Sequence, residues 1–429
     1  MISGLKKLVP EPIKNYYHFL VAFFGAITFG FPSRKLKVIG VTGTDGKTTT
    51  CHLIHHILNK TGQPTGLLST VEARIGDQSF ETGLHVTTPA PFAVQSILKK
   101  MVNAGTKYAV LETTSHALAQ ERVAFVNFQV GVVTNITIEH LDYHGSFENY
   151  LSTKAKILKK VKLRILNADD RSFSRLKDMG SGQLISFAIE EPADVTAKNV
   201  KHGSNSTEFS IHFLEKQKTE KIVEIKSRLI GDYNTYNMLA AFAATTSLGV
   251  EAQAAAAAIS SFPGVPGRMQ YIDEGQKFDC IVDFAHTPAA LEVVLRTLNR
   301  FKKGKIIVVF GCAGERDLGK RAVMGKIATQ LADYSIFTAE DPRKENVNQI
   351  IEQMAQGALA EGGIPNRTFW KIPDRGEAIN TAIGTLAAEG DIVAILGKGH
   401  EKSMSISGKE YPWSDEQIAR SSLKTRGNK

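Results

Sequence analysis

Cysteine is scarce in this chain, which has only three cysteines in 429 residues, at positions 51, 280 and 312. They form no C-x-x-C pair, so the sequence offers neither a disulfide framework nor a zinc-binding pattern, and a reducing cytosol is the default expectation. Charged residues make up 22% and hydrophobic residues 42% of the chain, which excludes a disordered protein. The length allows two to three domains of roughly 150 residues each.

A hydrophobic run long enough to cross a membrane is also missing. Residues 16–31 are apolar except for His18 and Thr28, but as a helix they would span only about 24 Å, against a hydrocarbon core of roughly 30 Å. No small-x-small cleavage site follows them, so a signal peptide is not expected. Two interpretations stay open: an aromatic helix that lies in the membrane interface, or a helix packed on the protein core.

Positive charge is concentrated near the start of the chain. The formal net charge is +9, and the first 37 residues contribute +5 of it, with six Lys or Arg residues against a single acidic residue, Glu11. The rest of the chain is close to balanced. Because the basic excess flanks an apolar segment and no nucleic-acid-binding module is present, the pattern favours an anionic membrane face over nucleic acid as its partner.

From Lys37 onward, short apolar runs alternate with helical stretches. The expected strands are residues 38–41, 108–112, 129–134 and 164–167, and the expected helices are 48–58, 92–104, 147–160, 236–248 and 251–260. Such alternation predicts a mostly parallel, doubly wound sheet. Residues 205–230 instead alternate polar and apolar side chains, which predicts antiparallel strands added at one edge.

A cluster of helix and strand breakers, Pro263-Gly-Val-Pro-Gly267, separates this region from a second α/β series. The expected strands of that series are residues 279–284, 305–310, 334–337 and 391–396. We therefore predict an α/β protein in three parts. These are a basic, aromatic N-terminal segment (1–36), a central P-loop domain with a mostly parallel sheet (37–262) and a C-terminal Rossmann-like α/β domain (263–429).

A glycine-rich turn follows the first expected strand and precedes a helix. Glycines there let backbone N–H groups approach phosphate oxygens, Lys47 would neutralise phosphate charge, and the Thr48 hydroxyl would reach Mg²⁺. The strand–loop–helix context favours an ATP site over an ordinary glycine turn. The residues expected to contact ATP are Gly43, Thr44, Asp45, Gly46, Lys47, Thr48 and Thr49. The first glycine is closer to the lysine than in the standard G-x₄-G-K-T spacing, which points to a particular family.

Further motifs follow in order along the chain. They include Thr87-Thr-Pro89, Glu112-Thr-Thr-Ser-His116, Asn135-x₃-Glu-His140-Leu-Asp-Tyr-His144-Gly, Gly267-Arg-Met269, Asp283-Phe-Ala-His286, Asp341-Pro-Arg343 and Gly397-Lys-Gly-His-Glu401. From about Gly40 to Ser414 the chain thus resembles the Mur ligases, and among them the MurE type, which adds a diamino acid to UDP-MurNAc-L-Ala-D-Glu in peptidoglycan synthesis. Within the family, ATP activates a carboxylate as an acyl phosphate, and an amine then displaces the phosphate.

The resemblance implies a cytoplasmic, monomeric enzyme with ATP and Mg²⁺ as cofactors, an ATP-binding central domain and an amino-acid-binding C-terminal domain. The implied catalytic residues are Lys47, Glu112, His140 and Lys154, and the implied metal ligands are Thr48, Glu112, His140 and, if carbamylated, Lys154. ATP contacts are also implied for Asn237, Arg268, Asp283 and His286. The acceptor would meet Thr87, Thr88, Thr114, Gln120 and Arg122, and the diamino acid would meet Arg316, Asp341, Arg343, Gly397 and Glu401.

Several positions depart from the family pattern. Asp45 replaces the usual Asn, Thr114 replaces Ser, and Glu340-Asp-Pro-Arg343 stands where diaminopimelate enzymes have Asp-Asn-Pro-Arg. Arg343 would pair with the distal carboxylate of diaminopimelate, whereas Asp341 would repel it and attract the ammonium group of lysine. Diaminopimelate is slightly favoured because Arg343 would otherwise lack a partner, and lysine stays open.

The start of the chain is the largest departure. Family members normally carry about a hundred residues before the phosphate loop, a typical small-domain size, and this chain has 42 before Gly43. The uridine-binding part is therefore expected to be missing or reduced to the aromatic helix. This leaves two alternatives: a ligase for polyglutamate, a lipid-linked or another cell-surface polymer precursor, and a membrane-associated nucleotide-binding scaffold without catalysis. Peripheral membrane contact through residues 16–31 also stays open.

Overall fold

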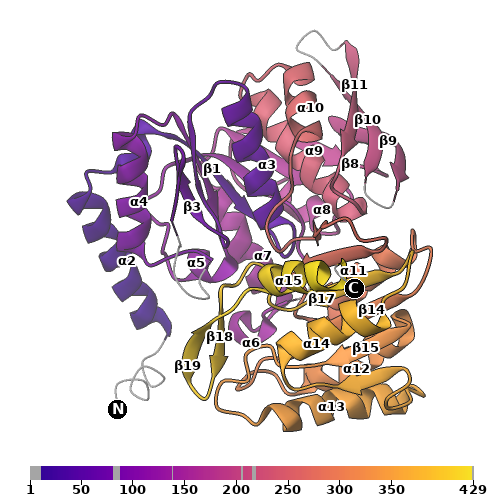
Figure 1. Cartoon of the computed structure of the whole chain (residues 1–429). Coiled ribbons are helices and arrows are strands. Elements are labelled where there is room, and N and C mark those ends of the chain that lie inside the picture. The colour runs from indigo at the N-terminus through magenta and orange to yellow at the C-terminus, as the bar shows by residue number, and fades with distance from the viewer. Residues whose placement is uncertain (1–10, 81–86, 138, 204–205, 215–218, 428–429) are drawn as a thin grey trace. The chain divides into compact units, whose positions relative to one another are not determined.

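The computed structural model describes residues 11–80, 87–137, 139–203, 206–214 and 219–427, without the side chains of 11–15 and 141–142 (Figure 1). Its contacts divide the chain into two compact units, Met1–Pro263 and Gly264–Lys429. Of the basic residues expected to flank the aromatic segment, Lys6 and Lys7 lie outside the described residues.

An eleven-stranded sheet, counted over the described residues, forms the centre of the first unit. Its parallel part runs in the order β8 (Gln183–Ala188), β7 (Leu163–Asn167), β6 (Phe128–Val133), β1 (Lys37–Thr42), β5 (Tyr108–Glu112) and β2 (Thr65–Leu68). At one edge β9 (Val195–His202) pairs parallel with β8, and β10 (Thr207–Leu214) and β11 (Glu220–Ser227) continue antiparallel. At the other edge β3 (Ala73–Ile75) and β4 (Gln78–Phe80) are antiparallel.

Helices cover both faces of this sheet, and that coverage explains why the central strands β1 and β5 are buried along almost their whole length. Val38 and Leu111 share a buried cluster with side chains of α4 (Pro91–Asn103) and α7 (Phe147–Ala155). Residue 39 points the other way, because strand side chains alternate between faces. The remaining helices include α3 (Lys47–Lys60), α5 (Ser115–Ala119), α6 (Leu141–His144), α9 (Asp232–Ser247) and α10 (Ala252–Ser260).

The second unit has a six-stranded sheet in the order β12 (Gln270–Tyr271), β13 (Asp279–Asp283), β17 (Ile392–Leu396), β14 (Ile306–Phe310), β15 (Tyr334–Phe337) and β16 (Phe369–Lys371). Only β12 is antiparallel. The unit also contains α11 (Pro288–Asn299), α12 (Gly319–Leu331), α13 (Val347–Ala360), α14 (Arg375–Thr381), α15 (Asp415–Gly427) and the hairpin of β18 (Ser403–Ile406) and β19 (Lys409–Pro412). The predicted α/β fold with a mostly parallel sheet is confirmed.

The aromatic segment forms α2 (Glu11–Thr28), which lies alongside α4 (Figure 1). Ala22 and Ala26 are buried on the packed side, and the rings of Phe19 and Phe23 lie 5.0 and 5.4 Å from that of Phe125. The large side chains Tyr16, Tyr17, Phe24 and Ile27 stay exposed. No helix in the described part of the chain combines the length and apolar character needed to cross a membrane.

Candidate active site

The phosphate loop lies between the carboxyl end of β1 and the first turn of α3. Gly46 has φ +80°, a conformation that glycine adopts without strain, and a Cβ there would collide with the Asn237 side chain. Lys47 Nζ donates hydrogen bonds to the carbonyl oxygens of Gly43 at 3.0 Å and Thr44 at 2.5 Å. The lysine ammonium is therefore held inside the loop, where a phosphate would bring negative charge.

Residues after β6 hold this loop from the neighbouring strand. Asn135 accepts a hydrogen bond from Asp45 N at 2.9 Å through Oδ1, and its carbonyl accepts one from Thr44 N at 2.9 Å. The Thr134 hydroxyl donates to the Asp45 carbonyl at 2.6 Å. The Asn135 motif thus fixes the loop backbone, a role that the sequence alone did not indicate.

Glu112 ends β5 as a carboxylate that is only 1% exposed. It accepts a hydrogen bond from the Thr48 hydroxyl at 2.9 Å, and the backbone N–H and hydroxyl of Thr70 both donate to it at 2.8 Å. The structure therefore brings Thr48 and Glu112 together, and it adds Thr70, which sequence reasoning missed because that residue follows the short strand β2 without a recognisable motif.

A carboxylate beside a hydroxyl at a phosphate loop suits Mg²⁺, which prefers oxygen ligands and often uses one or two carboxylates together with phosphate oxygens. His140 lies in the segment between β6 and α6. Its side chain is 44% exposed and its ring lies 4.8 Å from that of His116 and 6.5 Å from that of Tyr150. The described residues contain no group of three or more His, Cys, Asp or Glu side chains that could hold a metal ion.

Lys154, on α7, is 1% exposed, and its Nζ donates to the Gly43 carbonyl at 2.5 Å and lies 4.6 Å from the centre of the Tyr150 ring. Burial, reinforced by the nearby charge of Lys47, lowers the pKa of Lys154 well below its usual value. Lys159 and Lys160 are exposed, and Lys156 is paired with Glu121 at 2.7 Å. The structure thus separates Lys154 from three lysines that the sequence could not tell apart from it.

Thr88 connects the Glu112 strand end to the residues expected to hold the acceptor. Its hydroxyl donates to the Glu112 carbonyl at 3.0 Å and accepts from Thr114 N at 3.2 Å. The Thr114 hydroxyl in turn caps α5 by accepting from Ala117 N. Thr87 joins through the hydroxyl of Thr70 at 3.1 Å.

Arg122 continues the same network. Its Nη1 donates to the Thr88 carbonyl at 2.7 Å, while Nε and Nη2 donate to Gln120 Oε1 at 3.0 and 2.6 Å. Gln120 Nε2 donates to the Tyr143 hydroxyl at 3.2 Å. All five residues expected to bind the acceptor therefore belong to one connected set of hydrogen bonds.

Asn237 lies within α9 and is buried against the phosphate loop. Its Oδ1 accepts from the Thr50 hydroxyl at 3.2 Å, and its Nδ2 donates to Asn234 Oδ1 at 3.1 Å. It is not a helix-capping residue, because α9 begins five positions earlier at Asp232. Its contacts fit a residue that supports the nucleotide site.

In the second unit, the other three expected nucleotide residues gather around Phe284, just after β13. The guanidinium carbon of Arg268 lies 4.6 Å from the Phe284 ring centre, and the ring of His286 lies 4.6 Å from it. Asp283 accepts from Met269 N at 2.7 Å and from Ala285 N at 2.8 Å. Burial lowers the pKa of His286 to about 4, so its imidazole is neutral near pH 7.

Phe284 also contacts His400, whose ring lies 5.0 Å away. Burial lowers the pKa of His400 to about 4 as well. Sequence reasoning assigned no role to either residue, although both lie inside motif segments. In the sequence, they stood out only by lying within the motifs Asp283-Phe-Ala-His286 and Gly397-Lys-Gly-His-Glu401.

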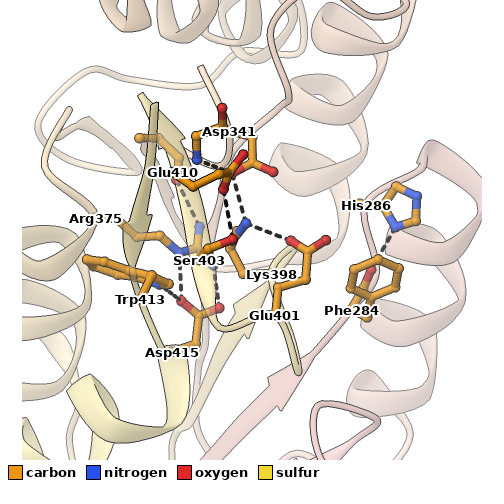
Figure 2. A network of polar contacts seen from close by, with 12 residues as sticks. Phe284, His286, Asp341, Arg375, Lys398, Glu401, Ser403, Glu410, Trp413 and Asp415 are labelled. Atoms are coloured by element: carbon orange, nitrogen blue, oxygen red, sulfur yellow. Dashed lines mark hydrogen bonds and ion pairs between the residues drawn. The ribbon is translucent and has the colours of Figure 1, made fainter. Parts of the chain in front are cut away.

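Four of the five residues expected to bind the diamino acid lie in the loops after β15 and β17, at the carboxyl edge where parallel sheets bind ligands: Asp341, Arg343, Gly397 and Glu401. Asp341 and Glu401 both contact Lys398 (Figure 2). Gly397 has φ +108°, and a Cβ there would lie 3.5 Å from the Glu340 carboxyl group. Arg316 is exposed on the loop after β14 and joins none of these contacts within the described residues.

Arg343 is half-buried and has φ +53°, a conformation held by its backbone N–H, which donates to the Ser405 carbonyl at 2.9 Å. No hydrogen bond or ion pair of its guanidinium group is found among the described residues. The backbone is therefore fixed at the strand edge, and the cation is available to a ligand.

A phosphate loop and a buried carboxylate in one α/β unit, with a cluster of charged residues at the sheet edge of the other, define a nucleotide-dependent α/β enzyme. The Mur ligase middle domain matches residues 41–245, and the Mur ligase, glutamate ligase domain matches residues 267–399. The chain belongs to the Mur ligase family of ATP-dependent peptide ligases, which confirms the resemblance seen in the sequence.

Several relatives carry names of the expected type. A UDP-N-acetylmuramoyl-L-alanyl-D-glutamate–2,6-diaminopimelate ligase of Geobacillus kaustophilus is 39% identical over 408 residues, which cover 93% of this chain and 81% of the relative. A UDP-N-acetylmuramyl-tripeptide synthetase of Roseiflexus sp. (strain RS-1) is 38% identical over 438 residues, 98% of this chain and 85% of the relative. A solved structure of a UDP-N-acetylmuramoyl-L-alanyl-D-glutamate–2,6-diaminopimelate ligase has a TM-score of 0.66 and 31% identity, and the match covers 91% of this chain and 79% of that one.

Proposed function

We propose that this enzyme joins meso-diaminopimelate to the D-glutamate carboxyl group of a UDP-MurNAc-L-Ala-D-Glu-like acceptor, with ATP and Mg²⁺, in peptidoglycan synthesis. The names of its relatives support the acceptor and the amine. The observation that carries the choice of amine is that Asp341 is already paired with Lys398 at 2.8 Å, while the guanidinium of Arg343 has no partner among the described residues. A distal carboxylate would supply that partner in a bidentate geometry.

In this proposal the first unit binds ATP and activates the acceptor. Lys47 stabilises charge on the transferred phosphoryl group, and Glu112 and Thr48 would hold Mg²⁺, with His140 as a further ligand. The metal would neutralise charge between the phosphate oxygens. The depressed pKa of Lys154 leaves more of its amine neutral, which favours the carbamylation implied by the family resemblance.

The acceptor carboxylate then takes the γ-phosphoryl group of ATP to form an acyl phosphate, and ADP leaves. The amine attacks the acyl carbon, phosphate leaves, and the nitrogen gives up a proton as the amide forms. Thr88, Gln120 and Arg122 orient the acceptor through their shared network. For Arg268, Asp283 and His286, which belong to the second unit, contacts with the adenosine part and phosphates of ATP are implied by the family resemblance alone. Glu401 and Gly397 contact the distal amino group of the diamino acid, Arg343 contacts its distal carboxylate, and Asp341 lies beside them. Arg316, on the exposed loop after β14, is a further contact that only the family resemblance implies.

Phosphate release with purified enzyme, ATP, Mg²⁺ and UDP-MurNAc-L-Ala-D-Glu tests this proposal directly. We expect turnover with diaminopimelate and slower turnover with lysine. Changing Arg343 to Ala should raise the KM for diaminopimelate about tenfold to a hundredfold, because a charge-assisted bidentate contact is lost. Arg367→Ala, at an exposed site of the same unit, should leave KM unchanged. Silence with both amines would refute the substrate assignment, and a preference for lysine would refute the choice of amine.

We also propose that α2 makes a peripheral contact with an anionic membrane face. Tyr17, Phe24 and Ile27 are 64, 57 and 48% exposed and follow each other at helical spacing. Arg34 and Lys35 are basic residues just beyond the helix. This arrangement matches an interfacial helix with aromatic residues towards the lipid. It also makes a lipid-linked precursor the second candidate acceptor.

Co-sedimentation with anionic vesicles tests the membrane contact. Serine at positions 17, 24 and 27 should weaken vesicle binding at least about tenfold, because the buried apolar area is lost. A matched control places serine at Leu214 and Ile222, which are 59 and 54% exposed on β10 and β11, and should bind like the unchanged chain. Equal binding by the unchanged and substituted α2 chains, or no binding by either, would overturn the membrane proposal.

A further inference from the structure

Lys398 is an unusual feature of the proposed amino-acid pocket because its side chain is fully buried. Its Nζ lies 2.8 Å from Asp341 Oδ1 and 2.6 Å from Glu401 Oε2 (Figure 2). A buried ammonium group is unfavourable unless it is paired. Two carboxylates from different loops therefore meet at one cation, which follows directly after Gly397 at the end of β17.

Asp341 is tied to the same place from a second side. Its Oδ1 also accepts a hydrogen bond from Ser405 N at 2.9 Å, and the Ser405 carbonyl accepts one from Arg343 N at 2.9 Å. Ser405, on β18, therefore links the two: its N–H contacts the carboxylate that pairs with Lys398, and its carbonyl contacts the backbone of Arg343. Any change at Lys398 therefore alters the charge and position of Asp341, which lies close to the Arg343 backbone.

Glu340 adds further acidity beside this pair. It is buried, its Oε2 has no hydrogen-bond partner within the described residues, and burial raises its pKa to about 7. The nearby cation Arg375 is paired with Asp415 at 2.7 Å, and its charge acts on Asp341 through space rather than through an ion pair. Lys398 is therefore the cation in direct contact with two of these three acidic residues, Asp341 and Glu401.

We propose that Lys398 is a specificity-determining counter-ion: by neutralising Asp341 it lets a pocket with this acidic residue accept a second carboxylate. The inference rests on the proposed function, because it concerns the distal end of the diamino acid. Without Lys398, Asp341 would present negative charge to a carboxylate, and would attract an ammonium group instead. The same pocket would then favour lysine.

Steady-state kinetics with diaminopimelate and lysine, on the full chain, test this inference. Lys398→Met should lower the ratio of kcat/KM for diaminopimelate over that for lysine at least about tenfold, mainly through KM for diaminopimelate. Adding Asp341→Asn to that variant should return the ratio to within about threefold of its original value, because the uncompensated charge is removed. Lys409→Met, on the exposed β19 of the neighbouring hairpin, should not move the ratio.

Loss of a buried cation can also unfold the chain, so Asp341→Asn alone provides an independent measurement. That variant keeps the Lys398–Glu401 pair and should raise the diaminopimelate-to-lysine ratio, by roughly tenfold. A ratio unmoved by Asp341→Asn, or an equal loss for both amines in Lys398→Met that Asp341→Asn does not repair, would overturn the counter-ion role. Absence of turnover by the unchanged enzyme with either amine would instead refute the proposed function, and the inference with it.

Discussion

Replacing Lys47 with alanine is expected to reduce ATP-dependent phosphate release about a thousandfold. Phosphoryl transfer depends mostly on positioning and charge neutralisation, and removing one well-placed charged donor typically has effects of this size. Lys47 also holds the loop, because its Nζ bonds to the carbonyls of Gly43 and Thr44. The measurement is kcat at saturating acceptor and amine, with ATP binding followed separately by calorimetry.

Lys60→Ala is the matched control, because Lys60 is an exposed lysine at the other end of the same helix. We expect its kcat to stay within about twofold of the original value, as for most surface substitutions. Lys47→Arg should recover only part of the activity, because the longer planar guanidinium does not replace a compact ammonium. A Lys47→Ala enzyme with unchanged kcat would show that the loop does not stabilise the transferred phosphate.

The sequence predicted the α/β fold well, because buried parallel strands such as β1 and β5 appear as continuous apolar runs whose length and spacing are visible in one dimension. Glu112 and Thr48 were predicted together only through the family motifs. Their direct hydrogen bond arises because β5 ends, and the helix that follows β1 begins, at the same edge of the sheet.

Other parts of the site could not be predicted, because they depend on burial or on pairing between distant segments. Lys154 and Lys159 look alike in the sequence, yet one is buried beside the phosphate loop and the other is exposed. Asp341 was expected to repel a carboxylate, but in the structure its charge is paired with that of Lys398. Its partner Lys398 lies 57 positions away in the chain, so the charge balance emerges only when the loops after β15 and β17 meet.

The two interpretations of the aromatic segment also could not be separated from its composition. A helix packed on a protein core and a helix lying in the membrane interface need the same apolar residue types. They differ in which face of the helix the rest of the protein covers. In the structure the small residues Ala22 and Ala26 face inward while Tyr17 and Phe24 remain exposed. The helix therefore both packs on the first unit and presents an aromatic surface.

The ion pair of Arg375 and Asp415 should have the largest effect on stability in the second unit. Both side chains are 0% exposed, and Arg375 donates to both oxygens of Asp415 at 2.8 and 2.7 Å. Asp415→Asn would leave the guanidinium buried without a counter-charge, so we expect the free energy of unfolding to fall by about 3–5 kcal/mol. Both tryptophans of the chain, Trp370 and Trp413, lie in this unit, so urea unfolding followed by tryptophan fluorescence measures the effect.

The same pair links stability to the pocket. Arg375 also donates to the carbonyl of Ala339 at 3.0 Å and to that of Leu396 at 2.9 Å, which lie where the loops after β15 and β17 begin. Asp415→Asn should therefore also raise KM for the diamino acid at temperatures where the unit stays folded. The exposed pair of Lys371 and Glu352 is the control, and Lys371→Met should change stability by less than about 0.5 kcal/mol. Equal unfolding midpoints for the two variants would mean that Arg375 is stabilised by its backbone carbonyl contacts alone, and that the buried charge of Asp415 is dispensable.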